Sequence, residues 1–250
     1  MEKMTNDSVE TSPQVYARTA GVLYLLIIIF GIFAEAFVRG TTVVPGDGAA
    51  TAANLMAMES LWRFGIAAEF LSLVCVTMLA MIYYFLLRPV QKELNLLSTF
   101  LMLIPVPIQA IAILNLTTAL FPIVNAASLK GFTPEQLQTL ASLAIRSHGY
   151  GFSVALLFVG SHFLIHGYLI FKSGYLPRVL GIMMEVAGVG YVTNSFVLIL
   201  YPAIASKVFL VVVLPIFLSE LSLSLWLLIK GVNIEKWNGR IRMNRAHEVS

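Results

Sequence analysis

The stretch AGVLYLLIIIFGIFAEAFV, residues 20–38, decides the fold class of this chain. It holds one charged side chain, Glu35, and as an α-helix it is long enough to cross a hydrocarbon core of about 30 Å. Similar apolar runs recur along the 250 residues, of which 58% are hydrophobic and 12% are charged. A soluble domain has about 25% charged residues. The composition therefore indicates a polytopic helical membrane protein.

Six apolar segments are predicted to span the membrane. Their expected ranges are 19–38, 61–87, 94–123, 149–171, 176–200 and 208–229. Pro105 and Pro107 are expected to kink the third span, because proline removes a helical hydrogen bond. We expect one membrane domain, residues 18–230, between an N-terminal tail of residues 1–17 and a basic C-terminal tail of residues 231–250.

The basic residues predict the orientation of the chain. With the N-terminus inside, 11 of the 16 Lys and Arg residues fall on the inner side and 5 on the outer side. The positive-inside rule then places both tails in the cytoplasm and the protein in the plasma membrane. We read the net charge of +3 as part of this topology rather than as nucleic-acid binding, and expect membrane lipids as partners. The single cysteine, Cys75, excludes an intrachain disulfide.

Two outer loops are predicted to contain short amphipathic helices. Asp47 can cap a helix that ends near Ser60. Thr133, with proline next and Gln136 three residues on, forms a capping box, and Gly149 fits a helix stop. The expected fold is therefore all-α, a bundle of six transmembrane helices with two short interfacial helices on the outer face.

Ionisable residues inside membrane spans are costly, and each is by default a functional hypothesis. By depth in the predicted spans, Glu35 and Glu69 share the outer half, and His162 and Glu220 share the midplane. A polar column through the bundle is one reading of this distribution, and hydrogen bonding between helices is the purely structural one. Our candidate ligand-binding residues are Glu35, Arg63, Glu69, His162, Asn194 and Glu220.

The stretch SHFLIHGYLIF, residues 161–171, carries two histidines four residues apart, which places His162 and His166 on one helix face. Imidazole and carboxylate groups are common metal ligands, so His162, Glu220 and Glu69 are the candidate ligands if a metal is bound. The zinc-protease motif HExxH is absent, and the sequence leaves the cofactor unknown. On the same span, Ser153, Gly160, Gly167 and Gly174 recur every seventh residue and predict a close-packing stripe.

Several strings resemble a bacterial family of multi-pass membrane proteins known as domain of unknown function 4386. They are ARTAGVLYLLIIIFGIFAE, VRGTTVVPGDGAATAANLMAMESLWRFGI, HGYLIFKSGYLPRVLG and SELSLSLWLLIKGVN, and the resemblance runs from Arg18 to Asn233. It implies a bacterial integral membrane protein and no particular activity. The family pattern includes Glu35, His162 and Glu220. His166 departs from that pattern, and Asn194 stands where the pattern has an acidic residue.

These observations favour a protein that binds a small molecule or a lipid headgroup in a polar intramembrane pocket open to the outer leaflet. One alternative is a metal-dependent intramembrane enzyme such as a lipid hydrolase. Another is a proton-coupled transporter. The sequence names neither the ligand nor the oligomeric state.

Overall fold

The computed structural model describes residues 12–248, with side chains described as far as residue 244. This part of the chain is helical and contains no strand. In chain order the elements are α1 (Pro13–Ile32), the π-helix η1 (Phe33–Arg39), α2 (Gly40–Thr42), α3 (Gly48–Ala57), α4 (Glu59–Leu87), α5 (Lys92–Leu103), α6 (Pro105–Val124), the 3₁₀ turn η2 (Ala126–Ser128), α7 (Pro134–Ser173), α8 (Arg178–Leu200), α9 (Pro202–Ile229) and α10 (Ile234–Glu248).

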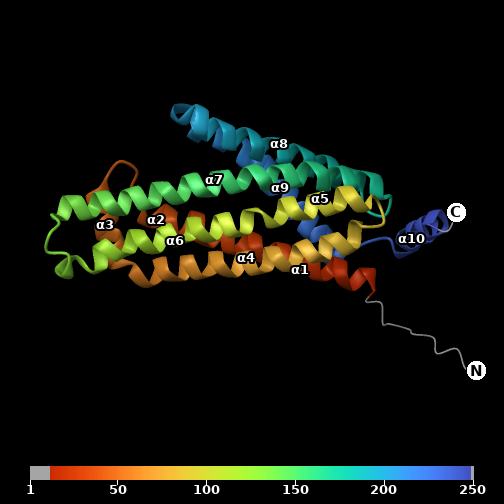
Figure 1. Cartoon of the computed structure of the whole chain (residues 1–250), viewed down its shortest axis with the longest axis horizontal. Helices are drawn as coiled ribbons and strands as arrows, with labels where there is room; N and C mark the ends of the chain where they lie inside the picture. Colours follow the sequence, from red (N-terminus) through yellow and green to blue (C-terminus); the bar gives the residue numbers. More distant parts are fainter. Residues whose placement is uncertain (1–11, 249–250) are drawn as a thin grey trace, which may run out of the picture.

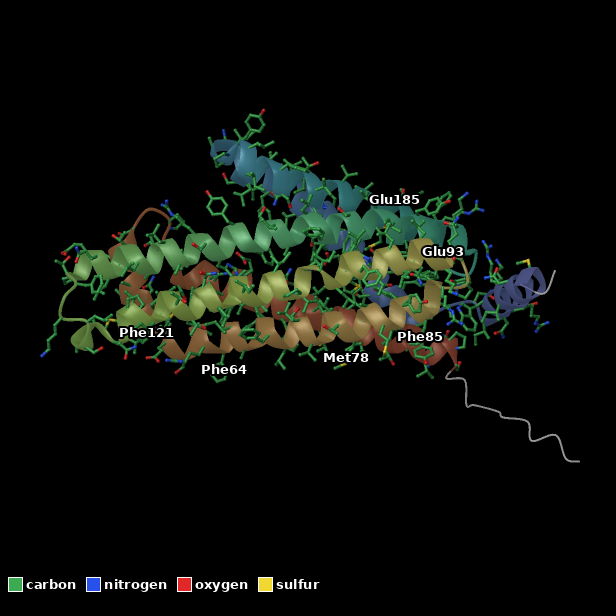
Figure 2. All side chains as sticks on the ribbon, viewed as in Figure 1. Phe64, Met78, Phe85, Glu93, Phe121 and Glu185 are labelled. Atoms are coloured by element: carbon green, nitrogen blue, oxygen red, sulfur yellow. The ribbon has the colours of Figure 1, made fainter. Side chains whose placement is uncertain are left out.

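Six helical segments in the described residues are long and apolar enough to cross a membrane, which confirms the predicted number of spans. They are Pro13–Thr42, Glu59–Leu87, Lys92–Val124, Pro134–Ser173, Arg178–Leu200 and Pro202–Ile229. They lie side by side with large apolar side chains on the outer surface, and Phe64, Met78 and Phe121 point away from the bundle (Figure 2). Such a surface suits lipid rather than water.

The bundle has two distinct ends (Figure 1). The start of α1 lies at the same end as α10, which we call the terminal end. The opposite end, which we call the distal end, carries α3 and the start of α7. Of the predicted N-terminal tail, residues 1–11 lie outside the described residues, and residues 13–17 already belong to α1.

The third span is two helices in sequence. α5 ends at Leu103 and α6 begins at Pro105, so the chain breaks its helix at Ile104. Pro105 has no amide hydrogen to donate to the preceding turn, so the hydrogen-bond ladder is interrupted here although Ile104 keeps helical angles of φ −54° and ψ −42°. The interruption lies at the proline where the sequence predicts a kink.

The structure corrects one of the two predicted interfacial helices. The helix capped by Asp47 forms as α3, with the Asp47 side chain accepting a hydrogen bond from the Ala50 amide at 2.8 Å. The Thr133–Gln136 capping box also forms. However, the helix that it starts does not stop at Gly149. It runs on into the fourth span as the single 40-residue helix α7, because a lone glycine costs a helix only about 1 kcal/mol and neighbouring helices offset that cost.

The helices α7 and α8 pack along matching small residues, as the sequence stripe predicted. A Cβ atom on Gly160 would lie 2.8 Å from the Gly188 carbonyl oxygen, and one on Gly167 would lie 2.5 Å from that of Gly181. These backbones therefore approach each other closely. Gly174 has a different role: it ends α7 in the left-handed conformation, with φ 77°.

The terminal end is closed by α10. The indole of Trp237 donates to the Leu86 carbonyl at 3.1 Å, and the hydroxyl of Tyr175 donates to the same oxygen at 2.6 Å. Burial raises the pKa of Tyr175, so its hydroxyl keeps the proton that it donates. The C-terminal helix is thus tied to the end of α4.

Candidate functional sites

The first polar site begins with the π-helix η1. Its closing hydrogen bond runs from the Gly40 amide to the Glu35 carbonyl, five residues back. The segment carries two charged side chains, Glu35 and Arg39, between α1 and α2. Short π-helical insertions within α-helices are rare and occur frequently at functional sites. This local geometry marks η1 as a candidate site.

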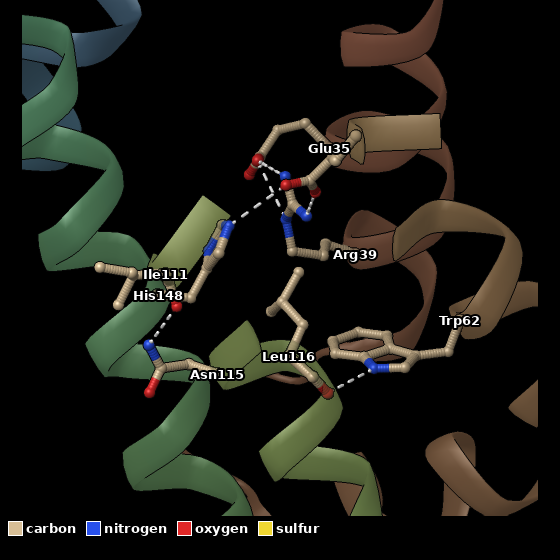
Figure 3. A network of polar contacts seen from close by, with 8 residues as sticks. Glu35, Arg39, Trp62, Ile111, Asn115, Leu116 and His148 are labelled. Atoms are coloured by element: carbon tan, nitrogen blue, oxygen red, sulfur yellow. Dashed lines mark hydrogen bonds and ion pairs between the residues drawn. The ribbon is translucent and has the colours of Figure 1, made fainter. Parts of the chain in front are cut away.

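Arg39 links this segment to α4. Its Nε and Nη2 donate to Glu35 Oε2, the former at 3.0 Å, and its Nη1 donates to Glu69 Oε1. His148 Nε2 of α7 lies 3.5 Å from the other carboxylate oxygen of Glu69. Figure 3 shows Glu35 and Arg39 of η1 meeting His148 of α7. We call Glu35, Arg39, Glu69 and His148 the distal cluster.

The distal cluster reaches from the core to the surface. The side chains of Arg39, Glu69 and His148 are 11%, 12% and 5% exposed, whereas that of Glu35 is 60% exposed. Exposed apolar side chains flank Glu35, since Ile32 is 48% and Phe37 is 55% exposed. Glu35 is therefore a carboxylate on the apolar outer surface, paired with a mostly buried arginine.

A close helix contact positions the cluster. Val38 of η1 is buried against Gly65 of α4, where an added Cβ would lie 3.0 Å from a Val38 methyl carbon. Glu69 lies one turn further along the same face of α4. Trp62 is also on this side of α4, and its indole donates to the Leu116 carbonyl of α6 at 3.0 Å (Figure 3). The small residue at 65 lets η1 approach until Arg39 reaches Glu69.

A second polar group lies towards the terminal end. It comprises Tyr24 of α1, Tyr83 of α4, Ser98 of α5, His162 and His166 of α7, Tyr191 of α8 and Glu220 of α9, which we call the terminal cluster. His162 Nδ1 lies 2.9 Å from both the carbonyl oxygen and the hydroxyl of Ser98. Because a carbonyl oxygen only accepts, Nδ1 carries the proton, and neutral His162 therefore presents an unprotonated Nε2.

Glu220 is held by a tyrosine. The Tyr191 hydroxyl donates to Glu220 Oε1 at 2.7 Å, joining α8 to α9. The carboxylate is also within electrostatic range of the hydroxyls of Tyr24 and Tyr83. Among the described residues, the Tyr24 and Tyr83 hydroxyls and His162 Nε2 are buried without a hydrogen-bond partner.

The two clusters are separate. His148 and His162 lie on α7 fourteen residues apart, which is about 21 Å along the axis at 1.5 Å per residue. Buried apolar side chains lie between the clusters, among them Ile28 on α1, Leu79 on α4 and Ala155 on α7. The structure therefore brings Glu35 together with Glu69, but separates both from His162 and Glu220. The continuous polar column is not present in the described part of the chain.

Two predicted site residues join neither cluster. Arg63 forms an exposed pair with Glu59, one turn before it on α4, with 2.8 Å between Nη2 and Oε1. Asn194 is buried on α8, and makes no hydrogen bond to either cluster in the described residues. A hollow of about 360 Å³ lies at the distal end between α3 and α7, but none of the six candidate residues lines it. The crevice beside Arg39, Val38 and Trp62 is too narrow for a water molecule.

The structure does not bring together the three candidate metal ligands. Glu69 faces Arg39 and His148, His162 faces Ser98, and Glu220 faces Tyr191. Within residues 12–248 no group of three or more His, Cys, Asp or Glu side chains lies close enough to hold a metal ion. The described residues thus form no binding site for the metal that the enzyme alternative needs.

Comparison with known proteins identifies the family. The family model described as "Domain of unknown function (DUF4386)" matches residues 19–231. The chain belongs to this family. It is also similar to a protein of Archaeoglobus fulgidus called "Uncharacterized protein", with 28% identity over 168 residues that cover 67% of this chain and 84% of that protein. No solved structure matches.

Sequence reasoning missed His148. It placed this residue at the end of a surface helix, because Gly149 resembled a helix stop. On a continuous α7, His148 and His162 are two heptads apart and share one face. That spacing was the available signal. Arg39 follows Glu35 by four residues, so helical spacing alone favours their pairing. Its bridge to Glu69 depends on how η1 packs against α4, which one sequence does not reveal.

Proposed function

We propose that this member of the family binds an amphiphile whose polar head carries an amine, and that Glu35 of the distal cluster is the contact residue. The observation that carries the proposal is the 60% exposed carboxylate of Glu35 on an apolar surface, backed by mostly buried Arg39 and Glu69. A carboxylate next to lipid is costly unless a partner neutralises it.

The charges of the cluster select the ligand. Two carboxylates, Glu35 and Glu69, face one guanidinium, Arg39, and the imidazole of His148 lies 3.5 Å from Glu69. With a neutral imidazole the cluster carries one excess negative charge. Arg39 already donates three hydrogen bonds to these carboxylates and is held by both. A protonated amine therefore complements the site better than a phosphate does. The amine can belong to a membrane lipid or to a lipophilic amine taken up from solution.

The predicted topology supports this assignment. With both tails in the cytoplasm, η1 lies in the outer half of the bilayer, where a headgroup reaches Glu35 from the side of the bundle. No enclosed chamber is needed, which agrees with the tight packing beside Arg39. The metal-dependent enzyme and the proton-coupled transporter have less support, since the clusters lie apart.

The test compares binding by the wild-type chain with binding by Glu35→Gln, reconstituted in nanodiscs of defined lipid. The control is Glu59→Gln, because Glu59 makes the same one-turn pair with an arginine but on an exposed helix end. The phosphatidylethanolamine retained by the protein is measured by mass spectrometry, with nanodiscs that also contain phosphatidylglycerol. A charged hydrogen bond contributes about 1.5–3 kcal/mol, so enrichment of the amine lipid should fall about tenfold or more in Glu35→Gln only.

A second arm separates the two sources of the amine. In nanodiscs without amine lipid, a long-chain alkylamine is titrated and its binding followed by calorimetry. Binding of the alkylamine without enrichment of phosphatidylethanolamine assigns the site to a free lipophilic amine. Equal lipid enrichment and equal alkylamine binding by wild type and Glu35→Gln would refute the proposal.

A further inference from the structure

The terminal cluster brings ionisable side chains into the largest apolar core of the bundle. Tyr24 and Tyr83 belong to that core, and Tyr191 packs against it. Its members come from six different helices, so each of the six spans contributes at least one side chain to the cluster. Buried polar atoms without partners are expensive, and a native structure retains them for a reason.

We propose that the terminal cluster is a proton-binding site, in which Glu220 exchanges a proton with His162 Nε2. This inference does not rest on the role of Glu35. No group of three metal-ligating side chains occurs in the described residues. Tyr24, Tyr83, His162 and His166 are buried, and Tyr191 and Glu220 are partly buried. A proton is the ligand that needs no cavity.

The inventory of donors and acceptors fits this role. Nδ1 of His162 is committed as a donor to the Ser98 carbonyl, which leaves Nε2 as a free base in the core. The hydroxyls of Tyr24 and Tyr83 each have a proton and no partner among the described residues. Glu220 is an acid whose Oε1 accepts from Tyr191. An acid, a base and two hydroxyls that can both donate and accept are thus gathered in one core.

Neighbouring side chains connect the acid to the base. The hydroxyls of Tyr24 and Tyr83 are within electrostatic range of the Glu220 carboxylate, and the two rings meet edge to face with centroids 6.4 Å apart. The Tyr83 ring lies 4.3 Å from that of His166, which lies 5.0 Å from that of His162. This series of neighbouring side chains therefore leads from Glu220 on α9, past Tyr83 on α4, to His166 and His162 on α7. His166 takes part in this connection.

The proton transfer is balanced without another reactant. A proton leaves the Glu220 carboxyl group, which becomes a carboxylate, and His162 Nε2 gains one, which gives an imidazolium. Nδ1 keeps its proton on the Ser98 carbonyl throughout. The titratable groups that face this pair are Tyr24, Tyr83, Tyr191 and His166, and Glu185 of α8 packs nearby against Gly167.

Infrared difference spectroscopy of the reconstituted full chain, recorded between two pH values, tests the role of Glu220. We expect a carboxylic-acid C=O band that is lost in Glu220→Gln and shifts in Tyr191→Phe, which removes one hydrogen-bond donor and keeps the ring. Glu185→Gln and Glu35→Gln should retain the band at the wild-type position. A band that persists in Glu220→Gln, or that does not shift in Tyr191→Phe, overturns the proposal. If Glu220→Gln does not fold, the Tyr191→Phe spectrum decides alone.

Nitrogen NMR of histidine-labelled protein tests the part assigned to His162. In wild type we expect its Nδ1 protonated at high pH and its Nε2 signal to change over the same pH range as the carboxyl band. In Glu220→Gln the Nε2 response should move to a different pH range. An Nε2 signal with the same pH response in both proteins would overturn the coupling.

Discussion

Gly65 of α4 lies directly against Val38 of η1, so close that a Cβ at residue 65 would come within 3.0 Å of a Val38 methyl carbon. This contact determines how near η1 comes to α4, and hence whether Arg39 reaches Glu69. The distal cluster therefore depends on a residue that carries no charge.

Enlarging residue 65 should weaken the cluster. Overpacking a tight contact costs about 1–3 kcal/mol, so we expect Gly65→Val to lower the free energy of unfolding by about that amount, with a smaller loss for Gly65→Ala. The measurement is the unfolding midpoint in detergent. Gly31→Ala is the control, because no atom lies within 4 Å of its added Cβ. Equal midpoints for Gly65→Val and Gly31→Ala would contradict the packing argument.

The members of the distal cluster should differ in their effects on stability. Arg39→Gln leaves the mostly buried Glu69 with only the His148 imidazole beside it, and breaking a buried ion pair costs about 3–5 kcal/mol. Glu35→Gln removes an exposed charge and should cost about 1 kcal/mol or less. The double variant Arg39→Gln/Glu69→Gln should recover part of the loss, because the charge that remains unpaired, on Glu35, is exposed rather than buried. Chemical denaturation of the four proteins gives the comparison, and an Arg39→Gln as stable as Glu35→Gln would disprove the ranking.

Sequence patterns predicted the spans because their length and apolar composition are set by the bilayer itself. The break at Pro105 and the caps at Asp47 and Thr133 were also predictable, since each follows from local backbone chemistry. The extent of α7 was not. Gly149 has the residue type of a helix stop, but packing against neighbouring helices keeps the chain helical there.

The grouping of polar residues was only partly predictable. The predicted depths of Glu35 and Glu69 in their spans correctly grouped these two residues, because depth depends only on the rise per residue of a helix. Which of these side chains contact one another depends on the rotation of each helix about its axis. Because of this rotation, Arg63 pairs with Glu59 on the exposed surface, and His148 lies next to Glu69. A single sequence contains no direct record of these rotations.

The contact between α7 and α8 should tolerate no side chain at its centre. A Cβ at Gly160 would meet the Gly188 carbonyl and side-chain atoms of Tyr191 and Val192 within 2.9 Å. We expect Gly160→Val to lower the unfolding midpoint strongly, by an overpacking cost of about 1–3 kcal/mol or more. Gly149→Val lies in the same helix with no atom within 4 Å and should change the midpoint little. Equal losses in the two variants would show that helix propensity, not packing, is responsible.

The cytoplasmic placement of both tails stays a prediction, and cysteine labelling tests it. Cys75 is 8% exposed and is replaced by alanine to remove the background. Ser128→Cys then reports on the distal end and Lys236→Cys on the terminal end, since both positions are exposed. In intact cells a membrane-impermeant maleimide should label Ser128→Cys at once, and Lys236→Cys only after permeabilisation. The opposite pattern would invert the topology, and would place η1 and Glu35 in the inner half of the bilayer.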